Sequence, residues 1–152
     1  MKLNTPIITR SPDETWNLAR SLVDAFRPPL ILALHGDLGA GKTCFVQGLA
    51  EAIGIGEAIT SPTFTMIREY MTGYCPLYHI DLYRIGDPDE LFSFGFEDYL
   101  TTNGITAIEW AERAGDLLPE NTLHLTFESL SEPDTRKITV RRTAPPPVRQ
   151  GG

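Results

Sequence analysis

The most constraining feature of this sequence is a glycine-rich loop that directly follows a run of apolar residues. The run LILALH (30–35) leads into GDLGAGKT (36–43), which matches G-x-x-x-x-G-K-[S/T] at every fixed position. A short continuous apolar run is typical of a strand buried on both faces of a parallel sheet. The next segment, KTCFVQGLAEAIGIG (42–56), has the pattern of a helix that ends at its glycines. A strand that feeds a helix through such a loop predicts a phosphate-binding loop (P-loop).

The residues of this loop indicate which ligand it holds. Its glycines let successive backbone N–H groups point at anionic oxygens, and the following helix adds the positive end of its dipole. Lys42 can reach the β- and γ-phosphates, and the Thr43 hydroxyl can reach Mg²⁺. Asp37 adds negative charge, so we expect it to point away from the phosphates. The alternative is a chance match in a turn, which the strand–loop–helix context disfavours. The loop therefore predicts binding of a nucleoside triphosphate.

The remaining segments predict the fold class. Helical patterns cover residues 11–26, where Ser11 is a capping residue, and 87–100, where Asp87 caps. Strand patterns cover residues 63–71, 76–85, 105–110, 121–130 and 136–142, the first two of which form a hairpin. We predict an α/β fold: a P-loop NTPase-like three-layer sandwich with a mixed, mostly parallel central sheet flanked by helices. Residues 1–143 are expected to form a single domain, and 144–152 a flexible tail rich in proline and glycine.

Charge and composition exclude several classes. The net charge of −7 argues against tight direct binding of nucleic acid. RKITVRR (136–142) is the one basic segment, and it is either a strand with one solvated face or an RNA-facing patch. No apolar stretch approaches the ~20 residues of a membrane helix, and the N-terminus has no signal-peptide core, so we expect a cytoplasmic protein without membrane contact. The two cysteines and three histidines do not have zinc-ligand spacing.

Two acidic residues stand where buried strands end. Asp81 follows LYHI, and Glu109 follows ITAI. In α/β sheets, ligands bind at the carboxyl ends of the strands, so both acids are candidates beside the loop. One would hold Mg²⁺, directly or through water, and the other would orient the attacking water; the sequence leaves both assignments open. Asp81 has a second interpretation as a residue in a local turn.

Three further residues are weaker candidates. Thr63, in SPT, can sense a γ-phosphate and its magnesium as switch segments do, or it can belong to a turn fixed by proline. Arg68 and Arg84 can supply charge to a transition state, or they can be solvated strand residues. The aromatic segment FSFGFEDY (92–99) can form either a partner-binding face or part of the core.

Five segments together resemble one known family. HGDLGAGKT, TSPTF, YHIDLYR, DELFSFGFEDYL and AIEWAER, in this order and spacing, are similar to the TsaE family, formerly YjeE. The resemblance implies a small ATPase that uses ATP and Mg²⁺, turns over slowly alone, and works with TsaB and TsaD. It implies a role in forming the threonylcarbamoyl group on adenosine 37 of tRNAs reading codons that start with A. The tRNA would be reached only indirectly, through the TsaB–TsaD complex.

The loop and the resemblance together give a set of site residues. Lys42, Asp81 and Glu109 would be catalytic, and Thr43, Asp81 and Glu109 would hold the metal. Trp110 matches the tryptophan of the family's I-E-W segment. Cys44 stands where members often carry a second Thr or Ser. The expected nucleotide-binding residues are Asp37, Leu38, Gly39, Ala40, Gly41, Lys42, Thr43, Cys44, Thr63 and Trp110.

Three other functions compete with this interpretation. A small-molecule kinase usually has an arginine-bearing lid, whereas the segment between Asp81 and Glu109 contains only Arg84. A GTPase needs an N-K-x-D element to read guanine, and the chain has none. A nucleotide-dependent binding module, in which hydrolysis is incidental, would differ in its response to loss of Glu109.

Overall fold

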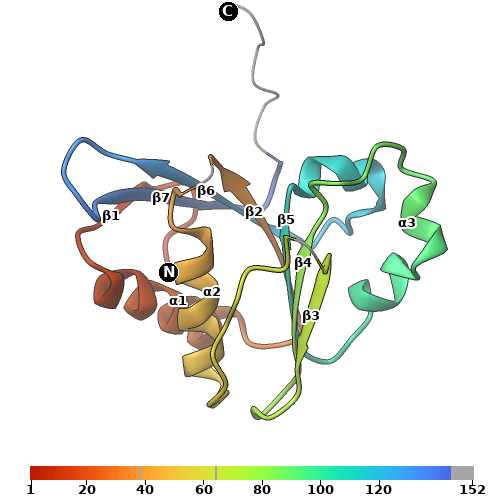
Figure 1. Cartoon of the computed structure of the whole chain (residues 1–152). Coiled ribbons are helices and arrows are strands. Elements are labelled where there is room, and N and C mark those ends of the chain that lie inside the picture. The colour runs from red at the N-terminus through yellow and green to blue at the C-terminus, as the bar shows by residue number, and fades with distance from the viewer. Residues whose placement is uncertain (38, 64, 145–152) are drawn as a thin grey trace, which may run out of the picture.

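A computed structural model describes residues 1–37, 39–63 and 65–144 of the chain. Seven strands form one sheet in the order β1-β7-β6-β2-β5-β4-β3 (Figure 1). The strands are β1 (Ile7–Thr9), β2 (Leu30–Gly36), β3 (Ile67–Tyr70), β4 (Leu77–Asp81), β5 (Ile105–Glu109), β6 (Leu123–Ser129) and β7 (Arg136–Arg141). The helices are α1 (Pro12–Phe26), α2 (Lys42–Ala52) and α3 (Glu90–Ser93), with 3₁₀ helices η1 (Phe96–Leu100) and η2 (Ala111–Leu117).

The centre of the sheet is parallel and its edges are antiparallel. β2 pairs in parallel with β5 on one side and with β6 on the other, and β4 continues the parallel set beside β5. β3 is antiparallel to β4, β7 to β6, and β1 to β7. Five strands therefore run in one direction, and only β3 and β7 oppose them, which confirms the predicted mixed, mostly parallel sheet. The carboxyl ends of β2, β4 and β5 consequently meet at one edge.

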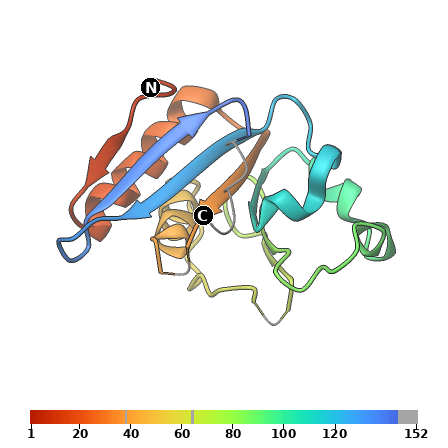
Figure 2. The same cartoon turned by 90° about the horizontal axis from the view of Figure 1, so that it is seen from above.

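Helices cover both faces of this sheet. In β2, Leu30, Leu32 and Leu34 belong to the core formed with α1 and α2, whereas Ala33 belongs to a second core with residues of α3, η1 and η2. Because side chains of a strand alternate between faces, these two cores lie on opposite sides of the sheet. Figures 1 and 2 show α1 and α2 grouped apart from α3 and η2. The predicted three-layer arrangement is confirmed.

Helix α1 begins and ends where the sequence predicts. The Oγ atom of Ser11 accepts a hydrogen bond from the backbone N–H of Glu14 (3.2 Å), and Pro12 occupies the first turn. The helix ends at Phe26, two residues before Pro28, which cannot continue it. Its buried side chains are Thr15, Leu18, Ala19, Leu22 and Val23. Their spacing places one stripe of the helix against α2 and the sheet.

The close approach of α1 and α2 depends on Gly48, and replacing it tests this packing. A Cβ atom at position 48 would lie 2.8 Å from the Cα atom of Trp16 and 2.9 Å from the Cβ atom of Ala19. We expect Gly48→Ala to lower the free energy of unfolding by about 1–3 kcal/mol, although alanine has the better helix propensity. Denaturant unfolding measures the change. Gly56→Ala is the control, since nothing lies within 4 Å of its added Cβ; equal effects of both variants would contradict this packing.

The sequence missed three details of the fold. The short strand β1 pairs with β7, and η2 follows β5, but neither was predicted. Residues 87–100 form two short helices rather than one, because Gly95 adopts a left-handed conformation (φ 74°) between them. Within the aromatic segment, Phe96 is fully buried and Phe92 is exposed, so the segment is divided between core and surface.

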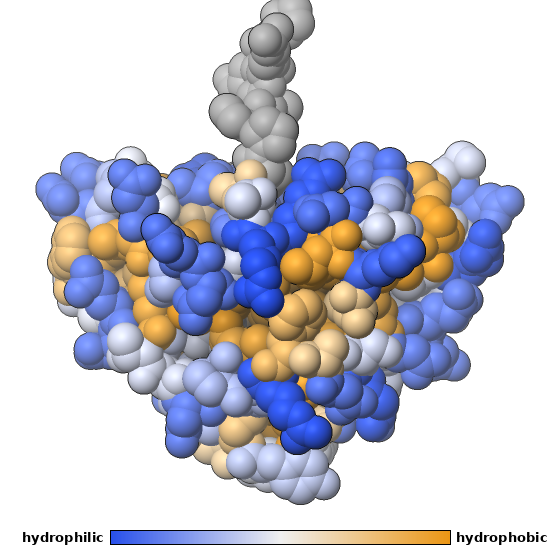
Figure 3. All heavy atoms as spheres, turned by 180° about the vertical axis from the view of Figure 1, so that it is seen from behind, coloured by the Kyte–Doolittle hydropathy of each residue, from blue (hydrophilic) through white to orange (hydrophobic). Residues whose placement is uncertain are grey.

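The surface carries few large apolar side chains. From behind, apolar residues form a broken band across the face, interrupted by polar residues (Figure 3). The large hydrophobic side chains that are exposed, among those the structure describes, are Met1, Met71, Tyr74, Tyr83, Phe92 and Leu130. In the same ranges of the chain, no helix is long and apolar enough to span a bilayer.

Candidate nucleotide-binding site

The loop between β2 and α2 has the backbone that its glycines predict. Gly36 adopts φ 146°, and a Cβ atom there would lie 2.5 Å from the carbonyl oxygen of Phe127 on β6. Gly41 adopts φ 102° immediately before the first residue of α2. Both positions therefore require glycine, and the loop can turn back over the N-terminus of the helix. Leu38, a predicted nucleotide-binding residue, lies outside the described residues.

Lys42 projects from the start of α2 into the space above the sheet. Its Nζ atom donates a hydrogen bond to the carbonyl oxygen of Gly36 (2.7 Å) and lies 3.7 Å from Oε1 of Glu109. Lys42, Asp81 and Glu109 are each at most 7% exposed, so their charges interact with little screening by water. This geometry brings the predicted lysine and one of the predicted acids into direct contact.

Strand register brings the two acids together. Asp81 of β4 is the direct register partner of Glu109 of β5. Oδ1 of Asp81 accepts from the backbone N–H of Tyr83 (2.8 Å), and Oδ2 accepts from the hydroxyl of Thr63 (3.4 Å). The Ser61 and Thr63 hydroxyls are 2.7 Å apart. Asp81 is therefore held on both oxygens, and the segment that contains Thr63 is tied to the sheet.

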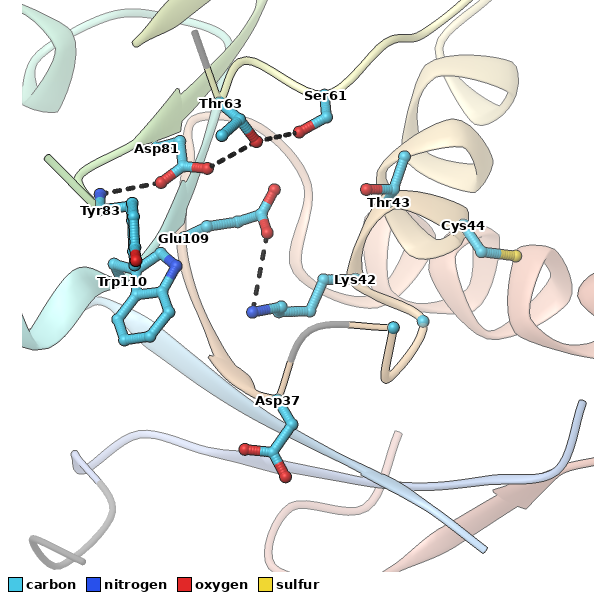
Figure 4. A pocket seen from close by; sticks show the side chains of 12 residues that line it. Asp37, Lys42, Thr43, Cys44, Ser61, Thr63, Asp81, Tyr83, Glu109 and Trp110 are labelled. Carbon is cyan, nitrogen blue, oxygen red and sulfur yellow. Dashed lines mark hydrogen bonds and ion pairs between the residues drawn. The ribbon is translucent and has the colours of Figure 1, made fainter.

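These residues surround one cavity of about 660 Å³ (Figure 4). Side chains from the phosphate loop, the 61–63 segment and the ends of β4 and β5 meet in it. Asp37 points away from Lys42, and the Cys44 side chain also points away, toward the Pro12 carbonyl oxygen. The lining residues are Asp37, Gly39, Gly41, Lys42, Thr43, Cys44, Ser61, Thr63, Asp81, Tyr83, Glu109 and Trp110.

The donor set fits a hard divalent cation that is shared with phosphate. Thr43, Asp81 and Glu109 supply oxygen atoms to the same cavity, and Mg²⁺ prefers oxygen ligands. Among the described residues, no group of three or more His, Cys, Asp or Glu side chains is arranged to hold a metal by itself. A cation here would therefore take its remaining ligands from a bound nucleotide and from water.

Glu109 is kept ionised by its neighbours. Burial of this carboxyl favours the neutral form, but a hydrogen bond from His79 and the positive charge of Lys42 outweigh it, and the pKa of Glu109 lies below its usual value of 4.5. The His79 Nε2 atom is 2.6 Å from Oε2 of Glu109. At neutral pH, Glu109 is a carboxylate that can accept hydrogen bonds from water or bind a cation.

Comparison with known proteins identifies the family. The family model described as "Threonylcarbamoyl adenosine biosynthesis protein TsaE" matches residues 9–138, which is most of the chain. The chain belongs to the TsaE family. A Bacillus subtilis relative named "tRNA threonylcarbamoyladenosine biosynthesis protein TsaE" is 40% identical over 131 residues, covering 86% of this chain and 81% of the relative. A Treponema pallidum protein of the same name is 38% identical, over 88% of this chain and 97% of the relative.

A solved protein structure has the same fold. The crystal structure of Bacillus subtilis YdiB superposes with a TM-score of 0.74 at 37% sequence identity. The match covers 90% of this chain and 83% of that one. The resemblance seen in the five sequence segments is therefore confirmed at the level of family and fold.

Trp110 lies near the Lys42 end of the cavity. It was predicted as a nucleotide-binding residue only from the family motif. It adopts a left-handed conformation (φ 57°) directly after β5. The Lys42 Nζ atom lies 5.7 Å from its ring centroid, and the ring of Tyr83 packs 5.1 Å away. Because the P-loop lysine contacts the β- and γ-phosphates, Trp110 would border that end of a nucleotide rather than its base.

Several residues at this site were not predicted from the sequence, among them Ser61, which lines the cavity beside Thr63. His79 contacts Glu109, and the Arg113 guanidinium lies 5.3 Å from the Trp110 ring. Arg136 of β7 donates to the carbonyl oxygen of Gly39 in the loop (3.3 Å), and Tyr83 lines the cavity. The H-x-D-x-Y pattern was a signal for His79 and Tyr83. By contrast, the candidates Arg68 and Arg84 are exposed and do not line this cavity.

A histidine pair beside the TsaE phosphate loop predicts a pH-dependent stability. The Nε2 atom of His35 lies 3.0 Å from Nδ1 of His124, and burial together with His35 lowers the pKa of His124 from its usual 6.5. Below pH 6.5 the unfolded chain therefore binds more protons than the folded chain. The contribution of His124 to the free energy of unfolding is complete above that pH and is lost as pH falls through the folded pKa. We expect the free energy of unfolding to decrease between about pH 7 and pH 5, and His124→Gln to reduce that slope. Denaturant unfolding at each pH measures it, and an unchanged slope in the variant would contradict it.

Proposed function

We propose that this chain is a Mg²⁺-dependent ATPase that acts in biosynthesis of threonylcarbamoyladenosine at position 37 of tRNA. One observation carries the proposal: Lys42 and Thr43 at the loop end of α2 share a cavity with two carboxylates from adjacent parallel strands. Phosphoryl transfer needs positioning and charge stabilisation more than covalent participation by the protein. A loop lysine, a hydroxyl for the metal and a carboxylate facing the γ-phosphate end supply these requirements.

The contacts of the two acids support different roles for them. Asp81 is hydrogen-bonded to Thr63, a residue suited to sense the metal and γ-phosphate, so we assign Asp81 with Thr43 to the cation. Glu109 lies 3.7 Å from Lys42, the side chain expected at the γ-phosphate, so we assign it to the attacking water. When bound, Mg²⁺ would neutralise charge on the phosphate oxygens.

We further propose that the protein acts with TsaB and TsaD in the cytoplasm and reaches tRNA only through them. Its net charge of −7 offers little attraction for a polyanion, which supports indirect contact. The ATPase would be one domain spanning residues 1–143. Tight, salt-sensitive binding of tRNA by the isolated chain would contradict indirect contact.

Removal of the metal tests the proposed chemistry. We expect phosphate release from ATP to fall by at least about tenfold when EDTA replaces Mg²⁺, because Thr43 and Asp81 would then face uncompensated phosphate charge. The measurement is steady-state release of phosphate, with Mg²⁺ restored as the control. A rate that is the same in EDTA would exclude a metal-dependent ATPase.

A further inference from the structure

His79 is a buried histidine that shares one face of the sheet with both acids. It lies in the middle of β4, two residues before Asp81, so both side chains point to the same face. Glu109 is the register partner of Asp81 and lies diagonally across from His79 on β5. The His79 side chain is fully buried, and its Nε2 atom lies 2.6 Å from Oε2 of Glu109.

Among the described residues, the side-chain hydrogen bonding of His79 is confined to Glu109. Its other ring nitrogen, Nδ1, is buried and has no hydrogen-bond partner in the described part of the chain. Because a carboxylate only accepts hydrogen bonds, Nε2 is the donor in this contact, and Nδ1 is left unpaired. An apolar side chain of similar size would fill this core position without an unpaired polar atom. Packing alone therefore does not explain histidine here.

The contact fixes one oxygen of Glu109 and leaves the other toward the cavity. Oε2 is bound by His79, whereas Oε1 faces Lys42 at 3.7 Å. A glutamate side chain has three rotatable bonds, and a single short hydrogen bond at its end removes most of that freedom. The buried His79 side chain, rather than solvent, therefore determines the orientation of Oε1 at the γ-phosphate end.

We propose that His79 is a positioning residue for ATP hydrolysis, which holds the Glu109 carboxylate so that Oε1 can orient the attacking water. The inference rests on the proposed ATPase function and adds a residue to it. His79 does not itself line the nucleotide cavity, whereas its partner Glu109 does, so its effect must pass through Glu109. Around metal ligands, loss of such supporting hydrogen bonds typically lowers affinity or activity 10- to 100-fold, and we expect a loss of similar size here.

The test compares two variants that fill the same space. His79→Leu removes the donor, whereas His79→Gln keeps an N–H that can reach the same carboxylate oxygen. We expect His79→Leu to lower kcat for ATP by about 10- to 100-fold with KM changed less than about threefold, and His79→Gln to recover most of kcat. Wild-type protein and Lys42→Ala are measured beside them, and thermal unfolding shows that each variant is folded.

Each alternative outcome overturns the inference. A kcat of His79→Leu within twofold of wild type, an equal loss in both variants, or a change confined to KM would show that the donor does not position Glu109. If His79→Leu does not fold, His79→Asn replaces it, because its amide is too short to reach Glu109, and the same comparison applies. Wild-type hydrolysis no faster than that of Lys42→Ala would instead refute the proposed ATPase, and with it this inference.

Discussion

Lys42→Ala is expected to reduce ATP hydrolysis by about 100-fold or more. The buried Lys42 ammonium lies beside Glu109 and donates a hydrogen bond to the carbonyl oxygen of Gly36. When ATP binds, Lys42 would exchange its contact with Gly36 for contacts with phosphate oxygens. The interaction energy between two charges is much larger in a site shielded from water than in solvent. Steady-state phosphate release with saturating ATP and Mg²⁺ measures the loss.

The matched control for this lysine is Lys137→Ala. Lys137 is a half-exposed residue of β7 that lies 3.8 Å from Glu128, so its removal should change the rate less than about twofold. Similar rates in Lys42→Ala and wild type would mean that the phosphate loop is not the hydrolytic site.

Glu109→Gln is expected to abolish most hydrolysis while sparing ATP binding. The amide keeps the size of the side chain and can still accept a hydrogen bond from His79, but it lacks the charge that orients and deprotonates water. We expect kcat to fall by about 100-fold or more. Binding, measured by the fluorescence of the neighbouring Trp110 on addition of ATP, should change less than about threefold.

Glu112→Gln provides the control for this carboxylate. Glu112 lies three residues further along the chain, is exposed, and contacts His35 rather than Lys42. Its rate should remain within about twofold of wild type. If Glu109→Gln stopped hydrolysis yet supported tRNA modification fully, the protein would be a nucleotide-dependent binding module.

The site was predictable from sequence where its chemistry is local. The apolar strand, the glycines and Lys42-Thr43 lie within 14 consecutive residues, and their conformations follow from neighbouring residues alone. Asp81 and Glu109 were identified because each ends an apolar strand. Their assignment to separate roles needed the register of β4 and β5 and the contacts of Thr63 and Lys42, which no spacing in the sequence specifies.

The missed features depend on segments that are distant in the chain. Arg136 reaches Gly39 across 97 positions, and its segment was predicted as either a strand with one solvated face or an RNA-facing patch. Strand β1 forms by pairing with β7. It has three residues, which are too few to show an alternating pattern in the sequence. The H-x-D-x-Y pattern marked His79, but its contact with Glu109 was not predictable, because alternation along one strand does not reveal a buried partner on the next.

The most direct test of the whole account is ATP hydrolysis by this chain alone and with its TsaB–TsaD pair, beside Lys42→Ala. The account predicts slow hydrolysis alone, a marked rise with the pair, and loss of both rates in the variant. If the pair leaves the rate unchanged, coupling of the site to the modification machinery is contradicted, and small-molecule phosphate acceptors become the substrates to test.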